Sequence, residues 1–208
     1  LAQWGAKVVV VDNFCNSSPE SIRRVEEITQ KSIPCLELDV RDQAGLEEVM
    51  TEHKPVAVIH FAGLKAVGES VEKPQLYFEV NFGSTSALCG AMQNCGVKNL
   101  IFSSSATVYG DLNQPPLTES MSTPMDRVAN PYGLSKLVIE QMLKWQQRAN
   151  SDWSVTLLRY FNPVGAHPSG KIGEDPQGDP NNLMPRVTRV ALGIIDKLHV
   201  FGTDYPET

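Results

Sequence analysis

Residues 7–12 read KVVVVD, four consecutive valines between a lysine and an acid. An uninterrupted β-branched run of this length is typical of a parallel strand that is buried on both faces. In dinucleotide-binding sheets, a Gly-rich turn follows the first strand, and an acid ends the second strand about 20 residues later. Asp12 fits that acid. The sequence therefore predicts a strand whose carboxyl end binds the ribose of a dinucleotide.

The residues before this strand contain no Gly-rich turn. Leu1–Trp4, followed by Gly5, resembles the last turn of a helix and its C-terminal glycine. At the other end, the chain stops after a strand-like stretch, Leu198–Phe201. We therefore expect the first strand and its turn to be missing, and the 208 residues alone to be catalytically inactive.

Downstream of residue 12, short apolar runs alternate with longer amphipathic segments. We expect strands at 33–39, 56–61, 100–104 and 155–160, and helices at 21–30, 43–53, 74–95, 131–147 and 183–192. This alternation predicts an α/β fold with a doubly wound parallel sheet of the Rossmann type. The Gly- and Pro-rich stretch 163–182 is longer than a simple connector, and such loops are usually functional. We expect a dinucleotide-binding domain over 1–162 and the beginning of a substrate-binding region over 163–208.

The composition narrows the class of protein. The net charge is −6 and no basic run is present, which argues against nucleic acid or an anionic membrane as the main partner. The longest apolar runs have the length of a strand, so no membrane span is expected. The four cysteines form no C-x-x-C pair and the four histidines lack metal-ligand spacing, so no metal is predicted. Reduced cysteines in the cytoplasm are the simplest interpretation.

Tyr132 and Lys136 form a Tyr-x-x-x-Lys motif in a predicted helix, and this spacing places both side chains on one helix face. A free tyrosine has a pKa near 10, and a neighbouring ammonium favours its phenolate. The pair can then accept a proton from a hydroxyl as hydride leaves the same carbon. The motif alone is common by chance. Serines 103–105 end a predicted strand, where ligands of open α/β sheets bind, and strengthen the interpretation.

Longer blocks carry a family resemblance. The chain resembles the extended short-chain dehydrogenase/reductase family, and within it the sugar-nucleotide 4-epimerases. The matching blocks are VVVVDNFCNS at 8–17, LDV at 38–40, VIHFAGLKAVGESVEKP at 58–74, NLIFSSSATVYG at 99–110, NPYGLSK at 130–136 and LLRYFNPVGAHPSGKIGEDPQGDPNNLMP at 157–185. The resemblance implies interconversion of UDP-glucose and UDP-galactose: NAD stays bound, C4 is oxidised, the 4-keto sugar turns over, and hydride returns to its other face.

The resemblance also implies which residues bind NAD. Asp12 would hold the adenosine ribose, and the other cofactor-binding residues would be Asn13, Phe14, Cys15, Asn16, Asp39, Val40, Phe61, Lys65, Lys136 and Tyr160. Asp39 and Val40 would lie against adenine, and Lys136 would bind the nicotinamide ribose. Without the resemblance, Phe61 and Tyr160 would be interpreted as core aromatics. Lys65 would be a solvated lysine, and His60 a packed strand residue.

Catalysis would rest on Ser105, Tyr132 and Lys136. The substrate would contact Ser105, Ala106, Thr107, Tyr132, Tyr160, Phe161, Asn162, Asn181, Asn182, Leu183, His199, Val200 and Phe201. His199 stands where the family pattern has Asn, and the family's diphosphate-binding arginine would lie beyond Thr208. The resemblance further suggests a homodimer through helices near 84–95 and 131–149.

Two alternatives remain. The first is a sugar-nucleotide 4,6-dehydratase of the same family, which needs an Asp-Glu pair after the strand-end serine. Ala106 and Thr107 occupy those positions, and neither transfers protons at neutral pH. The second is a noncatalytic truncated fragment that retains the motifs of its parent. The sequence also leaves open whether N-acetylated UDP-sugars are substrates.

Overall fold

The computed structural model describes residues 1–111, 115–178, 180–200 and 202. The chain forms two compact units. Unit 1 comprises Leu1–Asn13 and Ser32–Phe161, and unit 2 comprises Phe14–Lys31 and Asn162–Thr208.

Every strand pair in unit 1 is parallel. β1 (Val10–Asp12) pairs with β2 (Cys35–Glu37), and β3 (Val58–His60), β4 (Asn99–Ser105) and β5 (Ser154–Tyr160) form a second sheet in the order β3-β4-β5. Within the described residues, no pairing joins the two sheets. Parallel strands alternating with helices confirm the predicted α/β class.

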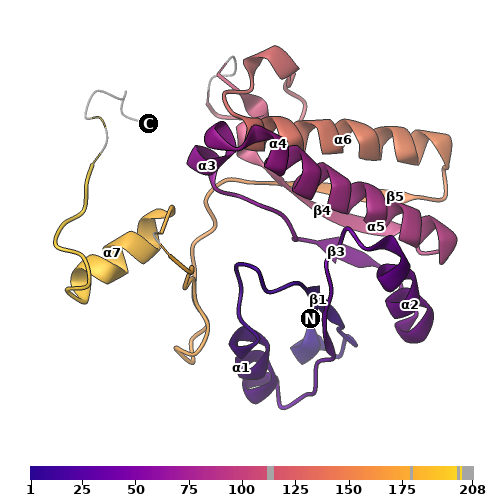
Figure 1. Cartoon of the computed structure of the whole chain (residues 1–208), viewed down its shortest axis with the longest axis horizontal. Coiled ribbons are helices and arrows are strands. Elements are labelled where there is room, and N and C mark those ends of the chain that lie inside the picture. The colour runs from indigo at the N-terminus through magenta and orange to yellow at the C-terminus, as the bar shows by residue number, and fades with distance from the viewer. Residues whose placement is uncertain (112–114, 179, 201, 203–208) are drawn as a thin grey trace. The chain divides into compact units, whose positions relative to one another are not determined.

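The helices of unit 1 bury one side of the β3-β4-β5 sheet. α2 (Gln43–His53), α5 (Gly83–Asn94) and α6 (Pro131–Ala149) contribute to one core, and α6 lies along β4 and β5 (Figure 1). The core consists of Leu46, Met50, Leu88, Cys89, Ala91, Met92, Val97, Leu100, Phe102, Ile139, Leu143 and Trp153. Because consecutive parallel strands are joined by crossovers of one hand, the two crossover helices lie on the same side. The carboxyl end of β4 and the first turn of α6 then lie at the same edge of the sheet.

Side-chain caps fix the starts of two of the predicted helices, α2 and α6. The Asp42 carboxylate accepts a hydrogen bond from Gly45 N at 3.1 Å, and Asn130 Oδ1 accepts one from Gly133 N at 2.8 Å. Each bond satisfies a backbone donor that the first helical turn leaves open. Between β3 and β4 the chain adds α3 (Val67–Glu72), which was not predicted, and α4 (Pro74–Tyr77).

A π-helical turn, Phe78–Phe82, joins α4 to α5. The helix predicted over 74–95 is therefore one continuous stretch that contains a local widening. Such π-turns are rare, and they occur frequently at functional sites. No helix within the described ranges combines the length and apolar composition that a membrane crossing requires.

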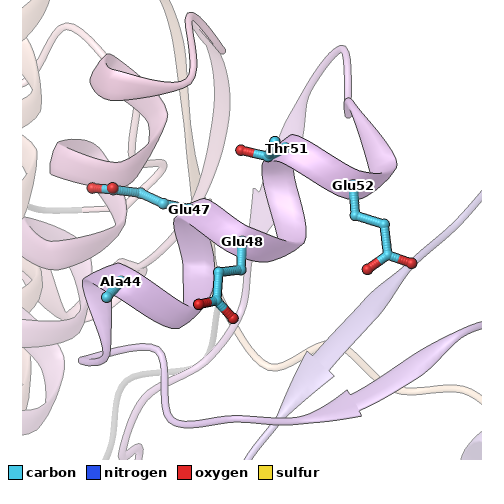
Figure 2. A pocket seen from close by; sticks show the side chains of 5 residues that line it. All are labelled: Ala44, Glu47, Glu48, Thr51 and Glu52. Carbon is cyan, nitrogen blue, oxygen red and sulfur yellow. The ribbon is translucent and has the colours of Figure 1, made fainter.

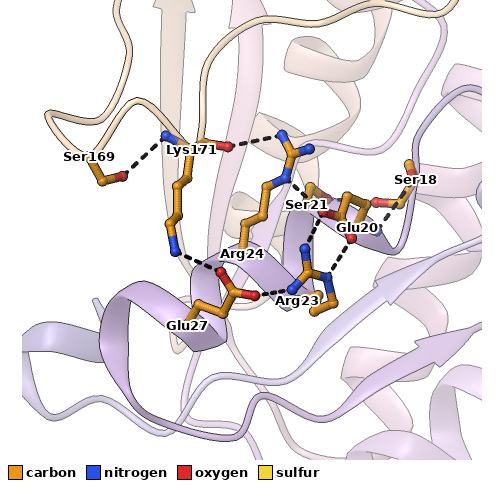
Figure 3. A network of polar contacts seen from close by, with 8 residues as sticks. All are labelled: Ser18, Glu20, Ser21, Arg23, Arg24, Glu27, Ser169 and Lys171. Atoms are coloured by element: carbon orange, nitrogen blue, oxygen red, sulfur yellow. Dashed lines mark hydrogen bonds and ion pairs between the residues drawn. The ribbon is translucent and has the colours of Figure 1, made fainter.

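Unit 2 contains α1 (Glu20–Thr29) and α7 (Leu183–Ala191). Figure 3 shows charged contacts between α1 and the loop near Lys171: Arg24 Nη1 donates to the Lys171 carbonyl at 3.0 Å, and Lys171 Nζ donates to Glu27 at 2.9 Å. Arg23 pairs with Glu20 and Glu27 on the same helix face. These side chains are exposed, so each pair contributes little to stability. Their effect is to hold the loop locally against α1.

Candidate functional site

The first turn of α6 approaches the turn that follows β4 unusually closely. A Cβ on Gly133 would lie 2.8 Å from Val128 Cγ1 and 3.0 Å from Thr107 Oγ1. Any larger residue would push the helix away from Thr107. Glycine at position 133 therefore lets Tyr132, its neighbour in the first turn, lie beside the end of β4.

Three hydroxyl groups meet at this edge. The Ser105 side chain lies close enough to the Tyr132 phenol to lower the pKa of that phenol. Ser105 Oγ also accepts hydrogen bonds from the Thr107 backbone N at 3.2 Å and from Thr107 Oγ1 at 2.9 Å. Ser105 is buried. The structure thus brings together Ser105 and Tyr132, the predicted hydroxyl and the predicted base.

Lys136 lies one helical turn beyond Tyr132 and is 5% exposed. Its Nζ donates to the Ser103 carbonyl at 2.9 Å and lies 4.9 Å from the centroid of the Phe102 ring. The same nitrogen is 5.9 Å from the centroid of the Tyr132 ring. Burial lowers the pKa of Lys136 to about 8, because the apolar surroundings disfavour its charged form. The tyrosine and lysine of the motif therefore share one helix face and one small region.

The pKa of Tyr132 moves in the direction opposite to the one that the motif predicts. Burial raises it, and the hydrogen bond with Ser105 offsets only part of that effect. Lys136 was expected to lower this pKa, but desolvation of the phenol outweighs any such effect here. The phenol therefore stays protonated at neutral pH, and an additional positive charge beside it is needed before it can act as a base.

Asn81 is a buried residue that the sequence reasoning missed. Its Oδ1 accepts a hydrogen bond from Leu64 N at 2.7 Å, and its Nδ2 donates to Leu64 O at 3.0 Å and to Ser135 Oγ at 3.1 Å. Gly63 packs against the same amide, since a Cβ there would lie 2.9 Å from Asn81 Oδ1. Asn81 thus ties the loop after β3 to α6 beside Lys136. The available signal for Asn81 in the sequence was a single amide side chain within a largely apolar stretch that is predicted to be helical.

His60 is a packed strand residue, as expected, and it lies beneath this edge. It is 3% exposed, and its Nε2 is 3.0 Å from Thr85 Oγ1. Burial, and secondarily the charge of Lys136, lower its pKa to about 3. The imidazole is therefore neutral at physiological pH.

Two phenylalanines that follow strand ends point into solvent. Phe61, after β3, is 61% exposed, and Phe161, after β5, is 62% exposed. The interpretation of Phe61 as a core aromatic is therefore wrong. Its ring centroid lies 6.4 Å from that of half-buried Tyr160, and Lys65 is exposed nearby in sequence. Exposed aromatic rings at the carboxyl ends of parallel strands are available to stack against a ligand.

The ends of β1 and β2 carry a second polar group. Asp12 ends β1, and Asn13 Nδ2 donates to Asp39 Oδ2 at 3.0 Å. Arg41 donates to both oxygens of Asp39, from Nε to Oδ1 at 3.0 Å and from Nη2 to Oδ2 at 2.9 Å. Its guanidinium holds the pKa of that carboxyl well below its usual range. Asp39 is therefore already engaged, whereas Val40, the other residue predicted near adenine, packs against the core.

Ala106 begins the turn that follows β4, and the other remaining predicted residues belong to unit 2. They are Phe14, Cys15, Asn16, Asn162, Asn181, Asn182, Leu183, His199 and Val200, and Phe201 lies outside the described residues. Phe14 has a left-handed backbone, with φ 52°. Asn182 is the N-cap residue of α7, and its Nδ2 donates to Glu174. Most of the others are exposed, and their roles in binding stay predictions.

A hollow in the surface of α2 does not coincide with this site. It is lined by Ala44, Glu47, Glu48, Thr51 and Glu52 (Figure 2). None of these is a predicted site residue. Its three carboxylates would repel the diphosphate of a nucleotide.

Comparison with known proteins gives a consistent result along the chain. Residues 1–204 match the model of the NAD dependent epimerase/dehydratase family. Over 99% of its length, the chain is 54% identical to UDP-glucose 4-epimerase of Bacillus subtilis and 52% identical to that of Homo sapiens. It is also similar to the crystal structure of UDP-glucose 4-epimerase from Bifidobacterium longum in complex with NAD+ and UDP, with 50% identity and a TM-score of 0.94.

The chain spans about 60% of the length of each of these curated relatives and 61% of that crystallised chain. The family match over residues 1–204 covers residues of both compact units, and positions 105, 132 and 136 at the end of β4 and on α6 fall within it. The chain belongs to the NAD dependent epimerase/dehydratase family.

Proposed function

We propose that the complete protein interconverts UDP-glucose and UDP-galactose by NAD-dependent oxidation and re-reduction at C4. One observation supports the proposal: Ser105, Tyr132 and Lys136 lie together at the carboxyl end of β4, where they could serve proton transfer at a sugar hydroxyl. The likeness to UDP-glucose 4-epimerases over 99% of the chain supports the same substrate.

The residues present fit an NAD cofactor. When bound, NAD supplies the acceptor and the donor of hydride. An ammonium has three donors, and the Ser103 carbonyl accepts one from Lys136, which leaves donors for the hydroxyls of a nicotinamide ribose. Gly63, with φ 149° and no side chain, lets the Asn81 amide lie close beside Lys136, which helps to hold the lysine at this edge. Asp12, at the end of β1, would bind the adenosine ribose.

The protein's own groups would move one proton. The Tyr132 oxygen would accept the proton of the C4 hydroxyl, while the Ser105 hydroxyl holds the reacting oxygen. The raised pKa of Tyr132 means that this acceptance requires the positive charge of the oxidised cofactor. The same phenol would return the proton when the sugar presents its other face. Unit 2 residues, among them Asn181, Asn182 and Leu183, would hold the UDP portion during that turn.

The dehydratase alternative lacks its chemical groups. Thr107 Oγ1 donates to Ser105, and Ala106 has no polar side chain. Neither can remove the C5 proton or protonate the C6 hydroxyl.

We further propose a role in galactose metabolism, a cytoplasmic location, and a homodimer formed through α5 and α6.

The complete protein, purified with its bound cofactor, is expected to convert UDP-galactose to UDP-glucose without added NAD. Chromatographic separation of the two sugar nucleotides measures the conversion. UDP-N-acetylgalactosamine, assayed in parallel, tests the wider substrate range. If the purified protein retains NAD but leaves UDP-galactose unchanged, the epimerase proposal is wrong and the noncatalytic alternative gains support.

The bound cofactor is expected to be NAD and not NADP, because a carboxylate at Asp12 bonds a ribose 2′-hydroxyl and repels a 2′-phosphate. Asp12→Ala should weaken NAD binding by about 10- to 100-fold, since hydrogen bonds to charged groups contribute about 1.5–3 kcal/mol. Release of the cofactor by denaturation, followed by mass spectrometry, identifies it. Recovery of mainly NADP from the parent protein would refute this assignment.

A further inference from the structure

Glu140 is a fully buried carboxylate that the proposed chemistry does not use. Its side chain is 0% exposed. Ser104 Oγ donates to Oε1 at 2.6 Å, Arg159 Nε donates to Oε1 at 2.9 Å, and Arg159 Nη2 donates to Oε2 at 2.7 Å. Glu140 belongs to α6, Ser104 to β4 and Arg159 to β5. One carboxylate therefore joins three elements.

Each of the three residues in this cluster lies next to a candidate site residue in sequence or one helical turn away from one. Glu140 lies one helical turn after Lys136 on the same helix. Ser104 immediately precedes Ser105 on β4, and Arg159 immediately precedes Tyr160 on β5. Since the hydrogen bonds are directional, they fix how far α6 is advanced along β4 and how it is rotated. Packing by apolar side chains would constrain the advance and the rotation of α6 less strictly than these hydrogen bonds do.

The buried Glu140–Arg159 ion pair is not the most stabilising choice of side chains for this place in the core. Arg159 Nη1 is buried and has no hydrogen-bond partner among the described residues, and the guanidinium carbon lies 4.8 Å from the centroid of the Tyr109 ring. An orphaned buried donor costs free energy. Replacing a buried ion pair with apolar residues of similar volume is often neutral or stabilising. Stability alone therefore does not account for a charged pair at this place.

We propose that Glu140, through Ser104 and Arg159, is a positioning residue that places Tyr132 and Lys136 against Ser105. The inference rests on the proposed function, since the placement matters because of the proton transfer. A shift of about 1 Å between reacting groups can cost about 100-fold in rate. The carboxylate thus acts on the reaction through the register of α6 and touches neither substrate nor cofactor.

The test compares variants of the complete, NAD-loaded protein. The double substitution Glu140→Leu with Arg159→Leu removes all three hydrogen bonds and both charges. We expect a melting temperature near that of the parent, a KM for UDP-galactose within a few-fold, and a kcat lowered about 100-fold. Ser104→Ala removes only the β4 contact and should lower kcat about tenfold. A Tm retained together with a reduced kcat separates positioning from a purely structural role.

Lys144→Ala is the matched control. Lys144 Nζ is 3.5 Å from Glu140 Oε2, but the lysine side chain is 41% exposed and reaches neither strand through an ion pair. This variant should keep the kcat, KM and Tm of the parent. Loss of kcat in Lys144→Ala equal to that of the double variant would overturn the proposal, since general electrostatics would then explain both.

Crystal structures of the loaded variants give a readout independent of turnover. In the double variant we expect the Lys136 Nζ contact with the Ser103 carbonyl to lengthen or break, and the Ser105 and Tyr132 side chains to move apart. Unchanged contacts and parent-like kcat in both the double variant and Ser104→Ala would overturn the inference. If the double variant does not fold, Ser104→Ala decides by the same readouts. A parent that does not epimerise UDP-galactose refutes only the proposed function, because the contact distances still decide the positioning.

Discussion

Tyr132→Phe in the complete protein is expected to lower kcat for UDP-galactose by about 10²- to 10⁴-fold, the usual effect of losing one positioned general base. The ring would still pack in the first turn of α6 beside Thr107. The phenolic oxygen, the ionisable atom that lies beside Ser105, would be gone. Ser105 is in contact with Thr107 and Tyr132, and only Tyr132 has an ionisable oxygen, so the C4 proton would lose its proposed acceptor.

The measurement is the initial rate of UDP-galactose conversion, together with bound NAD and the melting temperature. Both of the latter should match the parent, because phenylalanine preserves the packing of a residue that is only half-buried. The rate of the NAD-loaded parent should also rise with pH until Tyr132 has lost its proton, since burial raises the pKa of this phenol and the charge of the oxidised cofactor only partly offsets that effect. Turnover by Tyr132→Phe within a few-fold of the parent would exclude Tyr132 as the base.

The sequence predicts local features of this fold well because their causes are local. Asn130 and Asp42 cap the starts of two helices through hydrogen bonds to residues only three positions further along the chain. The extents of strands are predicted less well. The strand expected over 7–12 pairs only over Val10–Asp12, because the extent of a strand depends on its neighbour and not on its own valines.

Long-range contacts explain what the sequence could not predict. Asn81 and Ser135 are 54 positions apart, and Ser104 and Glu140 are 36 apart, yet each pair is hydrogen-bonded beside the candidate site. The direction of the Tyr132 pKa also depends on burial by distant segments. The Tyr-x-x-x-Lys spacing therefore identifies the two side chains but not their electrostatic environment.

Lys136→Met is expected to have two opposite effects. Activity should fall about 10²- to 10³-fold, since a preorganised charged donor at a reaction centre contributes that much. Stability at pH 7 should rise by about 1–3 kcal/mol. Burial lowers the Lys136 pKa from 10.5 to about 8, which corresponds to a cost of roughly 3 kcal/mol for keeping the buried amine charged. Methionine avoids that cost but loses the bond to the Ser103 carbonyl, about 1 kcal/mol.

The pH dependence distinguishes this explanation from a simple gain in packing. The folded-state pKa of Lys136 lies below its unfolded value, so between about pH 8 and 10.5 the unfolded chain binds more protons than the folded one. The stability of the parent should then increase with pH across that window, whereas Lys136→Met lacks this increase. Denaturant melts of both proteins at pH 7 and pH 9.5 measure the difference, which should shrink at the higher pH. A variant that is less stable than the parent at pH 7, or a difference independent of pH, would show that burial of the Lys136 charge costs the fold little.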